Sequence, residues 1–290
     1  MSMVDSNETL ADARARNIRD ALAEDIGRCD WTALLVPAAQ RVKARVVVRE
    51  NAVLCGRDWF DGCLAALDGS ARVDWRHAEG ARMSAGDEVC SIEANARALL
   101  SAERPALNFL QLLSGVATVT RAHADAIVGA SPNPRGCVVL DTRKTLPGLR
   151  QAQKYAVRVG GGQNQRLALW DGILIKENHI AAAGGIAAVL HDAAALKSGV
   201  GIQIEVESIV QLREALDAGA TSVLLDNFDL ARTREAVAVN AGRALLEASG
   251  GVTLEQLRAI AETGVDRISS GTLTKDLRAT DYSMRVVERL

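Results

Sequence analysis

Charged and small polar residues follow a series of short apolar runs in the second half of this chain. Six runs are present, at 137–140, 172–175, 202–204, 223–225, 244–248 and 267–268. Apolar runs of this length are typical of buried parallel strands. Because the catalytic groups of a β/α barrel lie where its parallel strands end, the residues that follow these runs are candidates for an active site.

Four basic residues occupy such positions. Arg143 and Lys144 come shortly after the first run, Arg166 follows the glycine-rich stretch 160–162, and Lys176 ends the second run. Arginine matches planar carboxylates and phosphates with its fork of donors, and lysine acts as a movable point charge. Their convergence on one barrel mouth predicts a ligand with several negative charges. Taken singly, each base could equally be a solvated turn residue or an ordinary strand end at the surface.

Acids and glycine-rich loops occupy the remaining run ends. Glu205 and Asp226 end consecutive runs, and carboxylates there suit Mg²⁺ or sugar hydroxyls. The loops Ser249-Gly250-Gly251 and Ser269-Ser270-Gly271 follow the last two runs, where barrels commonly bind phosphate through backbone N–H groups. Dicarboxylate, magnesium, ribose and phosphate together describe a phosphoribosyl transfer. The plainer alternative is that Glu205 and Glu207 only reflect the alternation of a strand.

Helical patterns separate the last strands and would position these residues. They cover 209–218, 229–241 and 254–263, and each is followed at once or nearly so by glycine, the common residue after a helix end. The last strand-to-strand steps are about twenty residues, the length of a β/α unit with short loops. The pattern predicts a β/α barrel with six visible strands, and a doubly wound sheet remains the alternative.

The first half of the chain mixes patterns and predicts a separate domain. We expect a helix over 10–25, strands at 41–50, 74–75 and 88–93, and a long helical stretch over 96–119. Pro105 predicts a break or a new helix start near Glu103. The expected domains are 1–117 and a barrel over 118–275, with 276–290 packing back on the first domain.

Composition limits the classes of function. The formal net charge of -2 over 290 residues leaves no basic surface for nucleic acid or an anionic membrane. The five cysteines lack the spacing of a metal site and predict reduced thiols. The first thirty residues lack the apolar segment of a signal peptide, and no stretch is apolar enough for a membrane helix. We therefore expect a cytoplasmic protein.

Several segments, in order and over nearly the whole chain, resemble the quinolinate phosphoribosyltransferase family. They are Ala102–Leu110, Asp141–Thr145, Leu174–His179, Glu205–Glu207, Leu224–Phe228 and Gly264–Ser269. The resemblance implies an α/β fold: an incomplete β/α barrel of the type II phosphoribosyltransferases with an N-terminal α/β-sandwich domain. It also implies a homodimer in which Arg104 completes the partner's active site.

The resemblance also assigns roles to individual residues. Quinolinate would be bound by Arg104, Arg143, Gln165, Arg166 and Lys176, and phosphoribosyl pyrophosphate by Lys144. Glu205 and Asp226 would hold ribose hydroxyls and Mg²⁺, and Lys144, Lys176, Glu205 and Asp226 would form the catalytic group. Ser249, Gly250, Ser270 and Gly271 would cradle the 5′-phosphate. The implied reaction turns quinolinate and phosphoribosyl pyrophosphate into nicotinate mononucleotide, pyrophosphate and CO₂ in NAD biosynthesis.

One position departs from the family pattern, and other functions remain open. Gln165 stands where the family often has histidine, and a neutral amide can donate a hydrogen bond but cannot become cationic. Lys275, where histidine is also common, remains cationic. Alternatives are a nicotinate phosphoribosyltransferase, a metal-transport-associated relative of the family, a Schiff-base lyase that uses a buried Lys176, and a non-catalytic binding barrel.

Overall fold

The computed structural model describes residues 7–290, which divide into two compact units. The first unit comprises the chain up to Val119 together with Thr145–Gly161 and Asp276–Leu290, and the second comprises Thr120–Lys144 and Gly162–Lys275. Residues 1–6 lie outside the described residues, and so do the predictions that they belong to the first domain and to no signal peptide. The segment 145–161, which the sequence analysis placed in the barrel, groups with the first unit.

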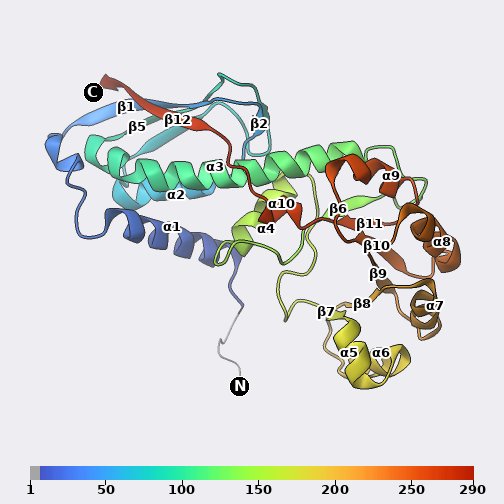
Figure 1. Ribbon diagram of the computed structural model, residues 1–290. Coiled ribbons are helices and arrows are strands. Elements are labelled where there is room, and N and C mark those ends of the chain that lie inside the picture. The colour runs from blue at the N-terminus through green and yellow to red at the C-terminus, as the bar shows by residue number, and fades with distance from the viewer. Residues whose placement is uncertain (1–6) are drawn as a thin grey trace. The chain divides into compact units, whose positions relative to one another are not determined.

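An antiparallel sheet forms one side of the first unit, with strand order β12-β1-β5-β3. The strands are β1 (Arg41–Val48), β3 (Arg72–Trp75), β5 (Glu88–Asn95) and β12 (Tyr282–Arg289), and β2 (Ala52–Val53) pairs separately with β4 (Arg82–Met83). Alternate residues of β1 are buried, as the alternating sequence predicts. The C-terminal strand β12 lies beside β1 (Figure 1), so the end of the chain completes this sheet.

Helices supply the rest of the first unit: α1 (Leu10–Ile26), the short 3₁₀ helix Ala33–Leu35, α2 (Arg57–Leu67), α3 (Ala96–Ala126) and α4 (Arg150–Val159). Helix α3 runs on past the unit boundary at Val119. The predicted break near Glu103 is wrong, because α3 continues through Pro105 as one helix of 31 residues. Proline removes one helical hydrogen bond, but Pro105 and its neighbours Ala106 and Leu107 are buried, and this packing holds the helix together.

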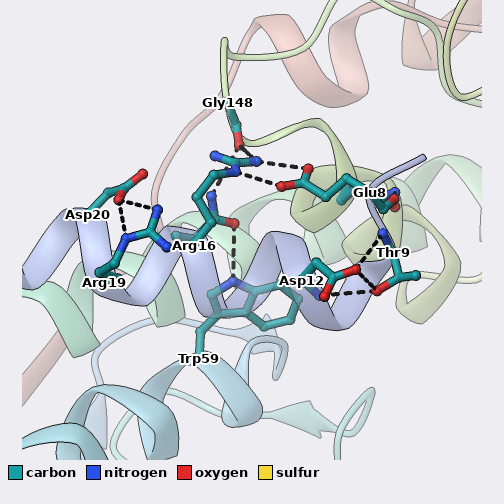
Figure 2. A network of polar contacts seen from close by, with 10 residues as sticks. Glu8, Thr9, Asp12, Arg16, Arg19, Asp20, Trp59 and Gly148 are labelled. Atoms are coloured by element: carbon teal, nitrogen blue, oxygen red, sulfur yellow. Dashed lines mark hydrogen bonds and ion pairs between the residues drawn. The ribbon is translucent and has the colours of Figure 1, made fainter. Parts of the chain in front are cut away.

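Polar contacts from α1 hold the loop before α4 in the first unit. The guanidinium of Arg16 and the amide of Asn17 each donate to the carbonyl of Gly148, both at 3.1 Å. Arg16 also pairs with Glu8, and the buried Asn17 accepts a hydrogen bond from the indole of Trp59 at 3.4 Å. Figure 2 shows this network around Gly148. These contacts explain why the segment leaves the second unit after Lys144 and returns at Gly162.

A six-stranded parallel sheet forms the second unit. Its strands are β6 (Val138–Leu140), β7 (Ile173–Ile175), β8 (Ile202–Val206), β9 (Ser222–Asp226), β10 (Leu245–Ser249) and β11 (Arg267–Ser269), one for each predicted run. Strands β7 to β11 are neighbours in chain order, and β6 follows β11 at the far edge from β7, which is the cyclic order of an opened β/α barrel. In a doubly wound sheet the first strands would instead lie at the centre, with later strands added on both sides. An isolated parallel bridge joins Leu140 to Gln163 on the outer side of β6. The fold is the expected incomplete barrel.

Helices alternate with these strands: α5 (Glu177–Ala183), α6 (Ile186–Ala195), α7 (Ile209–Asp217), α8 (Leu230–Asn240), the 3₁₀ helix Leu254–Gln256, α9 (Leu257–Ala261) and α10 (Thr272–Lys275). Neighbouring helices from α5 to α9 contact one another in chain order, so they form a continuous layer (Figure 1). Within residues 7–290, no helix has both the length and the apolar character needed to cross a membrane.

Candidate active site

A cavity of about 440 Å³ lies where the strands of the second unit end. All the candidate residues of that unit line it, namely Arg143, Lys144, Gln165, Arg166, Lys176, Glu205, Asp226, Ser249, Gly250, Ser270 and Gly271. Lys275 lines it too. Parallel strands bring their carboxyl ends to the same rim, so side chains far apart in the sequence meet here. This volume falls in the range of small-molecule binding sites.

Two arginines, Arg143 and Arg166, lie close together on the cavity wall. Arg166 donates one guanidinium hydrogen bond to the carbonyl of Gly172 at 2.9 Å. The Nε atoms of Arg143 and Arg166 are buried and have no hydrogen-bond partner among residues 7–290. Burial, and then the neighbouring Arg143 charge, lower the pKa of Arg166. Buried donors and facing positive charges are unfavourable without an anion, so this part of the cavity is built for an anionic ligand.

A buried carboxylate holds the Arg166 segment against strand β6. Asp141 is fully buried, and it accepts hydrogen bonds from the side chain of Asn164 at 2.6 Å and from the backbone N–H of Gln165 at 2.9 Å. The segment 163–166 therefore runs beside the end of β6, close to Arg143. This explains locally how bases from two separate stretches reach one place.

The position of Lys144 depends on the last loop of the barrel. Its backbone N–H donates to the hydroxyl of Thr142 at 3.0 Å, and its carbonyl accepts from the hydroxyl of Thr274 at 2.9 Å. A Cβ atom at Gly271 would lie 3.0 Å from Cδ of Lys144. Gly271 thus leaves room for the lysine, whose ammonium group makes no ion pair or hydrogen bond with the described residues and is available to a ligand.

The two acids predicted at the strand ends are both present on the cavity wall. Glu205 forms an ion pair with Lys176 at 2.9 Å, and Asp226 accepts a hydrogen bond from the side chain of Asn227 at 2.8 Å. Magnesium is typically held by one or two carboxylates and completed by substrate phosphates and water. Glu205 and Asp226 could serve as such a pair of carboxylates. Within residues 7–290, no cluster of three His, Cys, Asp or Glu side chains suited to a metal occurs.

Lys176 differs from a buried nucleophile. Its side chain is 45% exposed, and its ammonium group is engaged by the carboxylate of Glu205. A Schiff-base lysine needs a lowered pKa, which burial without an anionic partner would provide. Lys176 is neither buried nor without an anionic partner, so this geometry argues against the lyase alternative.

The first glycine loop has unused backbone donors. Gly250 and Gly251 have positive φ angles of 105° and 57°, which glycine adopts without strain. A side chain at Gly250 would overlap the amide of Asn227, whose backbone nitrogen lies 2.9 Å from the ideal Cβ position. Within residues 7–290, the N–H groups of Gly250 and Gly251 have no protein acceptor. Such an arrangement can bind a phosphate group.

The second loop offers a different set of donors. The backbone N–H of Ser270 is already bonded to the carbonyl of Leu140 at 2.9 Å. The hydroxyl of Ser270, which is paired with that of Thr272 at 2.7 Å, is therefore the group that it can offer to a ligand. The N–H of Gly271 has no acceptor among the described residues.

The cavity also contains residues that were not predicted from the sequence. Glu247 is 1% exposed yet lines the cavity, and it accepts a hydrogen bond from the buried Gln203 at 2.8 Å. Gln203 in turn accepts from the side chain of Gln165 at 3.0 Å. The sequence does contain a sign that Glu247 could belong to the site, since it is a carboxylate within the apolar run 244–248. Side chains alternate along a strand, so either Glu247 or its neighbours must point toward the barrel interior.

Arg104 belongs to α3 in the first unit. Its side chain is exposed and makes no ion pair or hydrogen bond with residues 7–290. It lines a separate hollow of the first unit together with Arg16, Asn108 and Leu149. Within one chain, Arg104 is therefore not among the cavity residues of the second unit.

Comparisons with known proteins agree with this geometry. The profile for the N-terminal domain of quinolinate phosphoribosyl transferase matches residues 30–114, and that for its C-terminal domain matches 116–285. The nicotinate-nucleotide pyrophosphorylase of Mycobacterium leprae is 42% identical, over 94% of this chain and 97% of its own length. A probable enzyme of the same name from Bacillus subtilis is 39% identical, over 91% and 90%.

Solved structures of this family are also similar to this chain. The nicotinate-nucleotide pyrophosphorylase of Francisella tularensis has a TM-score of 0.91 and 39% identity, and the match covers 97% of this chain and 100% of that one. Human nicotinic acid phosphoribosyltransferase, at 16% identity and a TM-score of 0.62, shares the fold alone. Both domain profiles match in the same order along most of the chain, so this chain belongs to the quinolinate phosphoribosyl transferase family.

Proposed function

We propose that this chain transfers the phosphoribosyl group of phosphoribosyl pyrophosphate to quinolinate, with loss of CO₂, and so makes nicotinate mononucleotide for NAD biosynthesis. Relatives carry the name quinolinate phosphoribosyltransferase [decarboxylating], for example one from Nicotiana glauca at 35% identity. The observation that carries the proposal is the pair Arg143 and Arg166, whose buried Nε atoms lack partners within residues 7–290, in a cavity that also holds carboxylates and glycine-rich loops.

The cavity residues suit each part of this chemistry. Arg143, Arg166 and Lys176 provide positive charge for two carboxylates, and the N–H groups at Gly250 and Gly271 suit a 5′-phosphate. Lys144 would neutralise charge on the pyrophosphate. Glu205 and Asp226 would accept hydrogen bonds from ribose hydroxyls. The protein acts mainly by positioning its substrates and by electrostatic stabilisation.

The reaction follows from this arrangement. The pyridine nitrogen attacks the ribosyl carbon, and the bond to pyrophosphate breaks with its electron pair leaving on the pyrophosphate. The ring nitrogen is then cationic, which stabilises the electron pair left on the adjacent carbon when CO₂ departs. A proton adds to that carbon. Glu205 and Asp226 would hold Mg²⁺, and the ion would supply positive charge for the departing pyrophosphate.

A homodimer is part of the proposal. Arg104 is exposed and without a partner among residues 7–290, as expected for a side chain that completes the active site of another subunit. An interface with two-fold symmetry would place two such arginines at two sites. We also propose a cytoplasmic location, which is supported by the absence of disulfides at all five cysteines.

The direct test is an assay with quinolinate, phosphoribosyl pyrophosphate and Mg²⁺ that follows nicotinate mononucleotide and CO₂ together. The proposal predicts equal amounts of both products. Nicotinate in place of quinolinate is the control, and it should be a poor substrate because it lacks the second carboxylate. Absence of product, or equal use of nicotinate without CO₂, would contradict the proposal.

A further inference from the structure

A row of three polar side chains runs beneath the cavity of the second unit. Gln165 and Glu247 line the cavity, whereas Gln203 does not. Gln203 and Glu247 are 9% and 1% exposed, in a barrel interior where apolar residues are the rule. Buried polar groups in such a place need a structural or functional reason.

Hydrogen bonds connect the three residues in one direction. The amide nitrogen of Gln165 donates to Gln203 Oε1 at 3.0 Å, and the amide nitrogen of Gln203 donates to Glu247 Oε2 at 2.8 Å. A carboxylate oxygen only accepts, so Glu247 determines that Gln203 presents its amide nitrogen. The oxygen of Gln203 then faces Gln165, which must donate. One carboxyl group thereby fixes the orientation of two amides.

The direction of this relay does not depend on the charge of Glu247. Burial raises the pKa of Glu247, and its hydrogen bonds with Gln203 and Ser269 act in the opposite sense. If the carboxyl is protonated, the proton belongs on Oε1, because Oε2 accepts from Gln203. Oε1 is buried. Oε2 remains the acceptor in either form.

We propose that Glu247 and Gln203 are positioning residues that hold the Gln165 carboxamide in one orientation, ready for a carboxylate of the substrate. An amide free to rotate would present its oxygen to an anion part of the time, and that contact is repulsive. A fixed amide avoids this loss, as preorganised groups do in general. This inference rests on the proposed function, since it takes a dicarboxylate as the ligand.

Substitutions that keep or remove the acceptor test the relay. Glu247→Leu and Gln203→Leu should each raise KM for quinolinate about tenfold, the effect of one lost or misdirected hydrogen bond. Glu247→Gln keeps an acceptor for Gln203 and should stay within about threefold of the unmodified protein. In all three variants, kcat and KM for phosphoribosyl pyrophosphate should change less than about twofold, because only uniform binding of quinolinate is lost.

A double-mutant cycle tests whether the relay acts through Gln165. Glu247→Leu should have little further effect on kcat/KM in a Gln165→Ala background, since coupled residues are not additive. Thr233→Val is a matched control, because Thr233 is 2% exposed in the same unit and does not line the cavity. It should leave both KM values unchanged.

Three results would overturn this inference. They would leave the proposed function intact, provided that the unmodified protein turns over quinolinate. They are wild-type KM in both leucine variants, additive effects in the cycle, and a Glu247→Gln variant as impaired as Glu247→Leu. Should Glu247→Leu fail to fold, Gln203→Leu and Glu247→Gln still decide the question. Unmodified protein that does not use quinolinate would instead refute the proposed function, and this inference with it.

Discussion

Replacing Arg143 with alanine should have opposite effects on catalysis and on the free protein. Arg143 has a buried Nε without a partner among residues 7–290, and its charge lowers the pKa of the neighbouring Arg166. In the free protein the two guanidinium groups repel each other. With a dicarboxylate bound, both would pair with it. The substitution therefore removes an unfavourable contact from the free protein and a favourable contact from the complex with the dicarboxylate.

The magnitude follows from the bonds lost. A hydrogen bond to a charged group contributes roughly 1.5–3 kcal/mol, and about 1.36 kcal/mol is a factor of ten, so a lost bidentate pair lowers kcat/KM by about 10²-fold or more. Arg143→Lys keeps the charge but loses the fork, and it should fall between the alanine variant and the unmodified protein. The free energy of unfolding without ligand should be unchanged or slightly higher, since the repulsion on Arg166 is gone.

Steady-state rates of nicotinate mononucleotide formation at varied quinolinate give kcat/KM, and urea unfolding of the free proteins gives stability. A folded Arg143→Ala protein with kcat/KM within about threefold of normal would refute the assigned role. A marked decrease in the free energy of unfolding of the ligand-free Arg143→Ala protein would refute the idea that Arg143 has no favourable partner in the free protein. The lysine variant separates the effect of charge from that of geometry.

Three further predictions concern other parts of the molecule. If Arg104 completes the partner's site, Arg104→Ala and Arg143→Ala proteins should each be nearly inactive alone. Mixing them should restore roughly a quarter of wild-type activity, because half of the dimers would be heterodimers and each heterodimer has one intact site out of two. No recovery after subunit exchange would argue against a shared site. Gly250→Ala should raise KM for phosphoribosyl pyrophosphate about tenfold or more, because its side chain would overlap Asn227 at a φ of 105°; an unchanged KM would argue against phosphate binding there. Burial raises the pKa of Asp61 to about 6, so its ionisation opposes folding. Asp61→Asn should therefore stabilise the protein by about 1–2 kcal/mol above pH 6, with the gain shrinking from pH 6 to pH 4 and absent below, as urea unfolding at several pH values would reveal; an equal gain at pH 4 and pH 8 would contradict this account.

The strands of the barrel could be predicted because the signal is local. A short buried strand between charged or glycine-containing ends is visible in a few consecutive residues, and all six predicted runs form strands. The helix break predicted at Pro105 was wrong because the conformation there is not decided locally. Its local effect is to interrupt a helix, whereas the packing of α3 around it depends on residues elsewhere in the first unit.

The sequence by itself determined the residue types of the candidate site and their places at strand ends. Only the tertiary structure decided which side chains meet. Gln165 and Gln203 are 38 positions apart and Gln203 and Glu247 are 44 apart, so they come into contact only when the sheet wraps into a barrel. The departure of 145–161 to the first unit was likewise invisible, because it depends on contacts of Gly148 with Arg16 and Asn17. Local pattern specifies strands and their polar ends, whereas pairing between distant positions follows from packing that no short segment encodes.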